Sequence, residues 1–558
     1  LDNNFMNEVR LADYLTTYLY DLGIKNVFML SGTGSIHLDD AFAHQKGMNY
    51  ICARHEAAAA MMATASAKLD GTVGVVIATT GPGGTNAIGG VTEAWVDSVP
   101  ILVISGQVYN KQISKDVRSF GVQGFNIIEN VKKITKYAKQ INDPSKIRFH
   151  LEKAIYLANN GRPGPVWLDI PFDIQEKKII PEKLNGYFPE ELITTEKTKD
   201  QLEPIIKELK KSKKPLIVFG QGVRNSNAIS NLNDMINRLQ IPSISARMAI
   251  DILEFDHPYY FGLGGMRGQK TPAKLLKECD LIIALGTSFT HAFAGQNYDQ
   301  FNSKAKIIMV NLDSNEMTKK NLKVDFPLKM DVKKFIEKIL NSLKNVKLSD
   351  NFTDWISKCN KIKAELEIDF IKSNPINSYY FIEKLNNHTN SNHIFVNDAG
   401  SANYICSQGL KIKKGQRELT SGAFYSMGVA VPLSIGASTA RPNSQVIAIT
   451  GDGSIELNIQ ELRTISINNL NIKLFIINNG GYASIRKSQD DMVGGRYTDD
   501  EEILNFSKVA DAFELPFYLI DDYKTIDSKL QKILKSNDPA LIEIVCDPNQ
   551  EIYEVFSE

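Results

Sequence analysis

Short apolar runs rich in β-branched residues recur along the whole chain and alternate with longer stretches of helical periodicity. Most of these runs end at a glycine or polar turn, which is typical of buried strands in parallel sheets. The candidate strands are Asn26–Leu30, Gly74–Thr79, Ile101–Ser105, Val166–Ile170, Pro215–Phe219, Leu281–Leu285, Ile307–Val310, Val446–Thr450 and Ile472–Ile477. This alternation predicts an α/β fold.

The length of the chain predicts several domains. A single core seldom serves more than about 150 residues, and this chain has 558. Two charged, poorly periodic stretches, Gln175–Asp200 and Asn341–Lys363, are predicted linkers. We therefore expect three Rossmann-like parallel-sheet domains, and the predicted boundaries are 6–180, 190–340 and 365–550.

The segment Val446–Ile485 has the pattern strand, turn, helix, strand, turn. Gly451-Asp452-Gly453 forms the first turn, and Ser454 is expected to cap the helix that follows. The second strand ends at Asn478-Asn479-Gly480-Gly481, whose glycines permit unusual backbone conformations. In a parallel βαβ unit both turns lie at the carboxyl edge of the sheet. Asp452 and Asn479 are therefore predicted to face one ligand.

The chemistry of these two turns indicates the kind of ligand. A carboxylate, an amide oxygen and backbone carbonyls are hard donors that suit Mg²⁺, which usually keeps phosphate oxygens among its ligands. A helix start and glycine amides favour the phosphates themselves. The plain alternative is an ordinary βαβ crossover with turn glycines.

Composition narrows the function classes. Lys plus Arg and Asp plus Glu both number 64, so nothing in the charge indicates nucleic acid or an acidic membrane surface. No apolar run reaches the roughly 20 residues of a membrane span, and the first residues lack a signal pattern. The five scattered cysteines argue against zinc and disulfides. We expect a cytoplasmic protein, and Leu1–Phe5, which precede Met6, are expected not to be native.

The first third of the chain carries three further motifs. Arg54-His55-Glu56 opens an alanine-rich helix, and a glutamate there is often simply a solvated residue favoured by the helix dipole. The glycine run Gly81-Pro82-Gly83-Gly84 loses an amide donor to proline and fits no phosphate-loop pattern, so we expect it to form a wall of the active site. The third motif is the loop Phe120–Phe125, whose plain alternative is a surface turn.

Together these motifs resemble thiamine-diphosphate enzymes of the acetolactate synthase and pyruvate decarboxylase superfamily, on its acetolactate-synthase-like branch. The segments that carry the resemblance are Gly451-Asp452-Gly453-Ser454, Asn478-Asn479, Arg54-His55-Glu56-Ala57-Ala58-Ala59, Thr79–Asn86, Gly106-Gln107-Val108, Phe120–Phe125 and Ser421–Gly428. The resemblance covers nearly the whole chain and implies a pyrimidine-binding, a middle and a diphosphate-binding domain, in that order.

The resemblance also implies the cofactor site. Asp452, Asn479 and the Gly481 carbonyl would hold Mg²⁺, and Met427 would prop thiamine diphosphate in a bent form. Glu56 would activate the cofactor by sharing a proton with its aminopyrimidine ring, because a carboxyl group in an apolar pocket has a raised pKa. The remaining implied cofactor-binding residues are Gly400, Ser401, Ala402, Gly451, Gly453, Ser454 and Tyr482.

The implied reaction is decarboxylation of a 2-keto acid, with pyruvate as the expected donor, followed by C–C bond formation with a carbonyl acceptor. Gln123 falls on a glutamine of the family's substrate pocket. The chain departs from the branch at Ser484 and Ser488, where the branch has methionine and tryptophan, and at Phe289-Thr290-His291, where no arginine is in register. Because arginine is the obvious partner of a carboxylate, the acceptor is expected to be a keto-sugar held by serines and His291.

Several alternatives stay open. The protein could be a simple 2-keto acid decarboxylase, an inactive cofactor-binding regulatory subunit, or an NAD- or FAD-dependent oxidoreductase. Gly220-Gln221-Gly222 and Gly262–Gly265 do not complete a dinucleotide fingerprint, and the binding of FAD by the middle domain is left undecided. The family also implies a homodimer or homotetramer, in which Glu56 and Asp452 meet across a subunit boundary.

Overall fold

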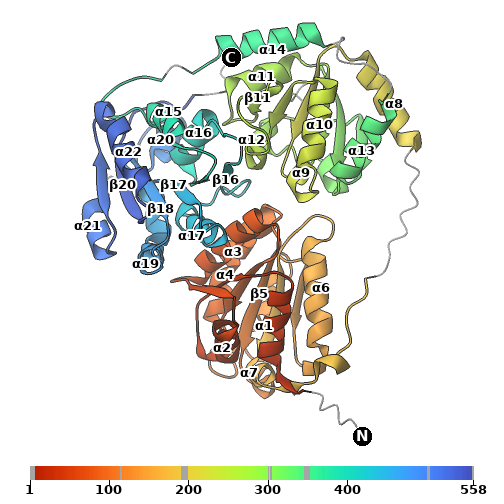
Figure 1. The fold of residues 1–558 in the computed structure, drawn as a ribbon, viewed down its shortest axis with the longest axis vertical. Coiled ribbons are helices and arrows are strands. Elements are labelled where there is room, and N and C mark those ends of the chain that lie inside the picture. The colour runs from red at the N-terminus through yellow and green to blue at the C-terminus, as the bar shows by residue number, and fades with distance from the viewer. Residues whose placement is uncertain are drawn as a thin grey trace.

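Three six-stranded parallel sheets, each flanked by helices, make up the fold (Figure 1). The computed structural model describes residues 7–113, 116–189, 199–298, 301, 304–344, 352–368, 370–498, 503–553 and 555. Leu1–Phe5 lie outside the described residues. The predicted α/β class with three parallel-sheet domains is confirmed.

The amino-terminal sheet has the strand order β3-β2-β4-β5-β7-β6. In that order the strands are Asn49–Cys52, Asn26–Met29, Gly74–Ala78, Ile101–Gln107, Val166–Pro171 and Tyr137–Gln140. Its helices are α1 (Leu11–Asp21), α2 (Ile36–His44), α3 (Glu56–Asp70), α4 (Pro82–Val96), α5 (Ile127–Val131), α6 (Ile147–Asn159) and α7 (Phe172–Gln175). The β-branched strands β4, β5 and β7 are buried along their whole length, as expected for central strands covered on both faces. The short strands β1 (Val9–Arg10) and β8 (Lys178–Ile179) pair antiparallel outside this sheet.

The alanine-rich helix α3 is enclosed by its neighbours. A Cβ on Gly90 of α4 would lie 2.3 Å from the Ala57 carbonyl oxygen. A Cβ on Gly436 of α17 (Ala430–Ala440), in the carboxyl-terminal domain, would lie 2.1 Å from the Met62 carbonyl oxygen. Small side chains on α3 and glycines on its neighbours therefore let the helix backbones approach closely. Buried residues of both domains share one apolar cluster around this helix.

The middle sheet has the order β11-β10-β9-β12-β13-β14. In that order the strands are Tyr260–Leu263, Ser243–Ser245, Pro215–Phe219, Leu281–Leu285, Lys306–Asn311 and Phe326–Lys329. Its helices are α8 (Lys199–Lys211), α9 (Gly222–Asn225), α10 (Ile229–Leu239), α11 (Lys270–Glu278), α12 (His291–Ala294) and α13 (Val332–Ser342). The strand order reverses between β9 and β12, and such a switch point leaves a crevice at the carboxyl ends of the strands.

The second predicted linker is wrong in part, because it contains most of a helix, α14 (Thr353–Glu365). Trp355, Cys359 and Ile362 follow one another at helical spacing and are buried against the middle domain. Trp355 also donates its indole N–H to the Pro215 carbonyl oxygen at 3.0 Å. Three apolar positions among lysines were too few to show a helical period in the sequence.

The carboxyl-terminal sheet has the order β16-β15-β17-β18-β20-β19. In that order the strands are Arg417–Leu419, His393–Asn397, Gln445–Gly451, Ile472–Asn478, Ala540–Val545 and Phe517–Ile520. Besides α17, its helices are α15 (Ser378–His388), α16 (Gly400–Gly409), α18 (Asp452–Ile455), α19 (Leu462–Ile467), α20 (Ala483–Val493), α21 (Phe506–Ala512) and α22 (Ile526–Lys535). A 3-10 helix, Glu456–Glu461, joins α18 to α19.

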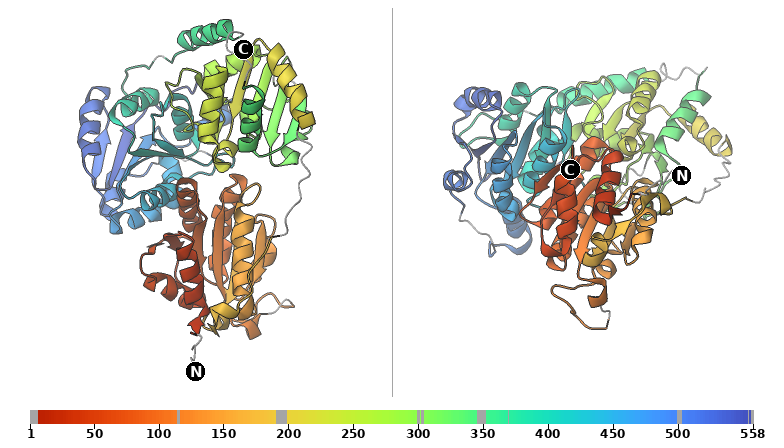
Figure 2. Two further views of the ribbon diagram at one scale, coloured as in Figure 1. Left: turned by 45° about the vertical axis from the view of Figure 1, so that its right-hand side comes forward. Right: turned by 60° about the horizontal axis from the view of Figure 1, so that its bottom comes forward.

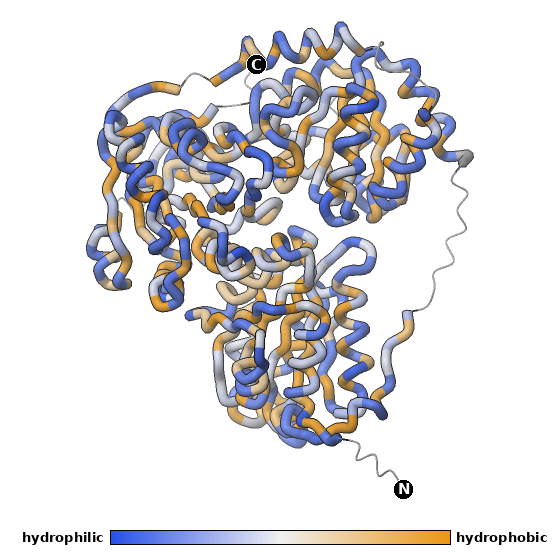
Figure 3. Tube along the Cα trace, viewed as in Figure 1, coloured by the Kyte–Doolittle hydropathy of each residue, from blue (hydrophilic) through white to orange (hydrophobic). Residues whose placement is uncertain are grey.

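The three domains meet at one junction, as Figures 1 and 2 show from three directions. Arg417 contacts all of them, because its own strand lies in the carboxyl-terminal domain while its side chain donates to Asp251 Oδ2 at 2.7 Å and to the Lys68 carbonyl oxygen at 3.0 Å. Hydrophobic segments run through the interior of each domain, with hydrophilic segments outside (Figure 3). Among the residues that the structure describes, no helix combines the length and apolar character needed to cross a membrane.

Candidate active site

The loops that follow β15, β17 and β18 meet at the carboxyl edge of the last sheet. The Asp452 carboxylate accepts backbone amides from Gly453 at 2.8 Å, Asn479 at 3.1 Å and Gly481 at 2.9 Å. Asn479 Nδ2 donates to Ser401 Oγ at 3.3 Å. The structure thus brings together the two turns that the sequence predicted to face one ligand, and adds the start of α16.

The donor set at this edge fits Mg²⁺ and a diphosphate. Asp452 is 3% exposed, and its burial raises the pKa of the carboxyl, an effect that the amide hydrogen bonds partly offset. The Gly481 carbonyl accepts one hydrogen bond, from Ala483, and keeps a second lone pair. A Cβ on Gly400 would meet nothing within 4 Å, so there is open space beside the first residue of α16. Within the described parts of the chain, no cluster of three or more His, Cys, Asp or Glu side chains could hold a metal.

The first helical residue after β17 differs from the prediction. Helix α18 begins at Asp452, with Gly451 as its N-cap, so Ser454 lies inside the helix and does not cap it. The carboxylate of this first helical residue accepts amides of the opposite loop. Tyr482 lies against the same turn, since a Cβ on Gly453 would come within 2.5 Å of its ring.

Met427 lies between β16 and α17, next to the same turn. Its neighbour Gly428 donates its amide to Asp398 at 2.8 Å, and a Cβ on Gly428 would lie 3.1 Å from the Ser454 carbonyl oxygen. Met427 itself is half-buried.

Glu56 is the first residue of α3 and is 4% exposed. Asn86 Nδ2 donates to Glu56 Oε2 at 3.0 Å. The Arg54 amide donates to Glu461 Oε1 in the carboxyl-terminal domain at 2.8 Å, so this segment lies at the boundary between the first and last domains. Pro82 begins α4, and the predicted glycine wall is therefore the first turn of the helix that carries Asn86.

Gln123 is exposed and adopts a left-handed φ of 63°. A buried network holds its loop. Gln107 Nε2 donates to the Phe125 carbonyl oxygen at 2.7 Å and to Asp169 Oδ2 at 3.1 Å. Ser105 Oγ donates to Asp169 Oδ1 at 2.6 Å.

The remaining predicted substrate residues lie in two places. Ser484 and Ser488 lie one turn apart on α20, where Ser488 Oγ donates to the Ser484 carbonyl oxygen at 3.0 Å. The Ser484 hydroxyl is buried and has no hydrogen-bond partner among the described residues. His291 is exposed, its Nδ1 lies 3.0 Å from the Gly295 carbonyl oxygen, and its ring packs on Tyr298. The structure does not bring His291 together with the serines.

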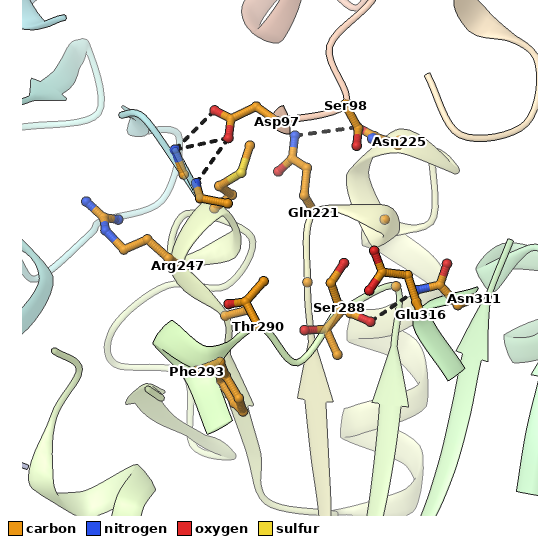
Figure 4. A pocket seen from close by; sticks show the side chains of 18 of the residues that line it. Asp97, Ser98, Gln221, Asn225, Arg247, Ser288, Thr290, Phe293, Asn311 and Glu316 are labelled. Atoms are coloured by element: carbon orange, nitrogen blue, oxygen red, sulfur yellow. Dashed lines mark hydrogen bonds between the residues drawn. The ribbon is translucent and has the colours of Figure 1, made fainter. Parts of the chain in front are cut away.

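A cavity of about 890 Å³ lies where the three domains meet (Figure 4). The glycines after β9 and β12 form its floor, and a Cβ on Gly222 would lie 2.6 Å from Gly286 Cα. Arg162, from the amino-terminal domain, reaches the lining and pairs with Asp313 at 3.1 Å and Glu316 at 2.8 Å. Thr290 lines the cavity, but His291 does not.

Sequence reasoning missed three residues that hold these loops. They are Asn86, Asp398 and Arg486. Asp398 is fully buried directly after β15 and accepts amides from both Gly428 and Ala430. Arg486 is 6% exposed, and it donates to the Asn479 carbonyl oxygen at 2.9 Å and to the Gly480 carbonyl oxygen. Asp398 carried a signal in the sequence, a carboxylate at the end of an apolar run, and Asn86 closes the motif Thr79–Asn86.

Three family models match this chain in order. They are the thiamine pyrophosphate enzyme N-terminal TPP binding domain at residues 9–132, the central domain at residues 202–339, and the C-terminal TPP binding domain at residues 398–544. The chain therefore belongs to the thiamine pyrophosphate enzymes.

Full-length relatives narrow that class. The chain is 32% identical to the acetolactate synthase large subunit of Lactococcus lactis subsp. lactis (strain IL1403), over 96% of this chain and 92% of the relative. It is 31% identical to the probable acetolactate synthase large subunit of Methanocaldococcus jannaschii (94% and 90% covered) and 30% identical to acetolactate synthase 1, chloroplastic, of Nicotiana tabacum (97% and 82%). It is thus an acetolactate-synthase-like, thiamine-diphosphate-dependent enzyme of the carboligase type, as the sequence motifs predicted.

Proposed function

We propose that this enzyme uses thiamine diphosphate and Mg²⁺ to release CO₂ from a 2-keto acid, with pyruvate as donor, and joins the remaining unit to a carbonyl acceptor. The observation that carries the proposal is the meeting of Ser401, Asp452 and Asn479 at the ends of three adjacent strands. When bound, thiamine diphosphate supplies the nucleophilic carbon on which C–C bonds break and form. The protein orients the reactants and excludes water.

Different residues would bind the metal and the diphosphate of the cofactor. Asp452, the Asn479 side-chain oxygen and the Gly481 carbonyl would hold the metal. The amides at the start of α16 favour a diphosphate through the helix dipole. The proposed cofactor-binding residues besides Glu56 and Met427 are Gly400, Ser401, Ala402, Gly451, Gly453, Ser454 and Tyr482.

Glu56 would hold the proton that the cofactor's aminopyrimidine ring shares. Its Oε2 accepts from Asn86, which leaves Oε1 to face the ring. Glu56 is 4% exposed, so little water would compete for a proton shared between its carboxyl group and a ring nitrogen.

The acceptor is proposed to be a keto-sugar and not a second keto acid. The buried Ser484 hydroxyl, which has no hydrogen-bond partner in the described part of the chain, is a polar group shortly after the proposed metal loop. Arg162 and Arg247, which line the three-domain cavity, are paired with carboxylates, whereas Arg267 of the same cavity lies over the Tyr404 ring. Arg486 is engaged by loop carbonyls. The Ser484 hydroxyl suits the hydroxyl groups of a sugar better than it suits a carboxylate. Ser488 and Gln123 stay predictions as substrate residues. His291 stays a prediction at a separate place, on α12 of the middle domain.

Product analysis tests this proposal. Purified protein with thiamine diphosphate and Mg²⁺ is given pyruvate, alone and with keto-sugars, and acetolactate, acetaldehyde and CO₂ are measured separately. We expect CO₂ release that rises when a keto-sugar is added. Rapid acetolactate formation would contradict the sugar acceptor, and acetaldehyde as the main product would indicate a simple decarboxylase. A cofactor-loaded protein without CO₂ release from any 2-keto acid would be an inactive subunit.

The cavity between the domains is proposed to bind FAD. Its volume of about 890 Å³ suits a dinucleotide, and it opens at the strand-order switch between β9 and β12. The close approach of Gly222 to Gly286 brings backbone groups to the cavity floor. A visible flavin spectrum of the purified protein, or of protein mixed with FAD, tests this.

The active form is proposed to be a homodimer or homotetramer with sites at the subunit interface. Two apolar side chains are strongly exposed in the single chain: Val122, in the loop Phe120–Phe125, is 87% exposed, and Met492, on α20, is 84% exposed. A C₂ partner would cover them. Size-exclusion chromatography showing an active monomer would contradict this.

We also propose a cytoplasmic location, supported by five free cysteines. The proposed domain boundaries are 6–180, 190–340 and 365–550.

A further inference from the structure

The loop Thr420–Gly428, which carries Met427, is anchored at its second half by its own domain. Asp398 accepts the amides of Gly428 at 2.8 Å and Ala430 at 3.1 Å. Asn458 Nδ2 donates to the Gly428 carbonyl oxygen at 2.8 Å. These contacts fix the residue that follows Met427.

The first half of the loop is anchored by the amino-terminal domain. Asp97 accepts the Gly422 amide on both carboxylate oxygens at 3.1 Å and the Ala423 amide at 3.2 Å. Lys68 donates to Asp97 at 2.8 Å and to the Thr420 carbonyl oxygen at 3.0 Å. The contact of Asp97 with the loop is visible in Figure 4.

The residue before Met427 is held from the same domain. Ser426 Oγ donates to Glu93 Oε2 at 2.6 Å. Glu93 is 1% exposed, and burial, together with the charge of Asp97, raises the pKa of its carboxyl. Both neighbours of Met427 in the chain are therefore fixed, one by each domain.

The loop has little freedom to adopt another path. A Cβ on Gly422 would lie 2.0 Å from Met248 Sδ and 2.9 Å from Asp97 Oδ1, so the loop is pressed between the middle and first domains. Tyr425 has a φ of 55°, a left-handed conformation that is unfavourable for a bulky residue and persists only when its surroundings hold it.

Apart from Lys68 on α3, the amino-terminal contacts come from one face of α4 and from its C-cap residue, Asp97. Asn86, Glu93 and Asp97 follow one another at spacings of seven and four residues, which places them within about 40° on a helix of 3.6 residues per turn. Asn86 contacts Glu56, while Glu93 and Asp97 contact the Met427 loop. One helix face thus contacts both Glu56 and the loop that carries Met427.

We propose that this polar face of α4 is a positioning element: Glu93 and Asp97 hold Met427 in place while Asn86 holds Glu56. This inference rests on the proposed function, which gives Met427 and Glu56 their roles. Burying two carboxyl groups between domains carries a desolvation cost, and apolar residues of similar size would stabilise the contact at least as well. Their hydrogen bonds instead fix the path of the loop.

The test uses full-length protein with thiamine diphosphate and Mg²⁺. In Ser426→Ala and in Glu93→Leu we expect kcat with pyruvate to fall about tenfold, because small misplacements of positioning groups are costly. The Kd for thiamine diphosphate, followed by tryptophan fluorescence, should change less than about threefold, because the diphosphate end of the site is intact. Glu93→Gln keeps an acceptor for Ser426 and should recover most of kcat.

Thr92→Ala is the matched control, since Thr92 lies on α4 beside Glu93 and its hydroxyl donates to the Ile88 carbonyl oxygen of its own helix at 2.8 Å. We expect it to leave kcat unchanged. If Ser426→Ala and Glu93→Leu lower the thermal midpoint and leave kcat intact, the positioning role is overturned.

Hydrogen exchange separates this inference from the proposed function. Asp97→Asn should speed exchange of the Gly422 and Ala423 amides at least about tenfold, and Thr92→Ala should not. If exchange of these amides is unchanged in Asp97→Asn, the proposed hold of α4 on the Met427 loop is wrong, whether or not the protein is active. If the wild-type protein releases no CO₂ from any 2-keto acid, the proposed function fails. The exchange result still shows whether Asp97 holds the loop.

Discussion

Asp452 accepts the backbone amide of Gly481 at 2.9 Å, so the carboxylate proposed to bind the metal also holds the loop that would offer its carbonyl to the same metal. The donors are therefore arranged by one another before any ion arrives. Such preorganisation lowers the entropy that binding must overcome.

Asp452→Asn is expected to weaken Mg²⁺ binding at least about tenfold, since it removes the only charge of the proposed donor set and turns an NH₂ group toward backbone donors. Calorimetric titration of Mg²⁺ in the presence of thiamine diphosphate measures the effect. Asp491→Asn, an exposed carboxylate on α20 that pairs with Lys487, is the control and should bind Mg²⁺ normally. If Asp452→Asn binds Mg²⁺ as tightly as Asp491→Asn does, Asp452 is not a ligand of the metal.

Asn86→Ala is expected to lower kcat about tenfold, because Glu56 loses the donor at Oε2 and with it a fixed carboxyl orientation. Glu56→Gln should cost about a hundredfold or more, since it removes the proton-sharing group itself. CO₂ release under saturating cofactor measures both. A Glu56→Gln variant as active as the wild type would refute the assigned role.

Arg486→Met is expected to raise the Mg²⁺ concentration for half-maximal cofactor binding about tenfold, because the carbonyls of Asn479 and Gly480 lose a charged donor and the metal loop loosens. Arg486→Lys should recover little, since one ammonium group cannot span two carbonyls as a planar guanidinium does. Lys487→Met, at the next and exposed position of α20, is the control. Tryptophan fluorescence quenching by thiamine diphosphate provides the readout.

Asp169 gives a pH prediction. Burial raises the pKa of this carboxyl to about 6 from an ordinary value of 3.8, with the hydrogen bonds from Ser105, Gln140 and Gln107 opposing the shift. Because the folded-state pKa is the higher one, the group's contribution to stability is fully present below about pH 4 and is lost as the pH rises through about 6. The whole change is about 3 kcal/mol at 1.36 kcal/mol per pKa unit.

Urea unfolding of wild type and Asp169→Asn, compared between pH 4 and pH 7, measures this contribution. Trp167 is a local reporter, since its indole donates to Ser105 Oγ, which in turn donates to Asp169. The advantage of the wild type in unfolding free energy should be larger at pH 4 than at pH 7. A difference independent of pH would contradict the raised pKa.

Much of the fold was predictable because buried parallel strands leave a strong signal. The two strands around Asp452 and Asn479 were expected at Val446–Thr450 and Ile472–Ile477, and they are found at Gln445–Gly451 and Ile472–Asn478. Turn chemistry at their ends then predicted that the two residues would meet, since both turns of a βαβ unit lie at one sheet edge.

The supporting contacts were not predictable, because they depend on how helices pack between domains. Arg486 lies on an amphipathic helix like many surface arginines, yet its guanidinium turns inward to the metal loop. His291 was predicted to hold the acceptor, but its ring packs on Tyr298 and its Nδ1 lies by the Gly295 carbonyl oxygen. Neither orientation follows from spacing in the sequence.

The polar face of α4 has a consequence for an assembled enzyme. In a dimer whose sites lie across the subunit boundary, Glu56 would serve one site and the Met427 loop of the same chain the other. Each α4 would then be a mechanical link between two reaction centres, and a cofactor that tightened one loop would strain or relax the proton-sharing glutamate of its neighbour. In such an enzyme, cofactor bound at one site would change the affinity of the other site.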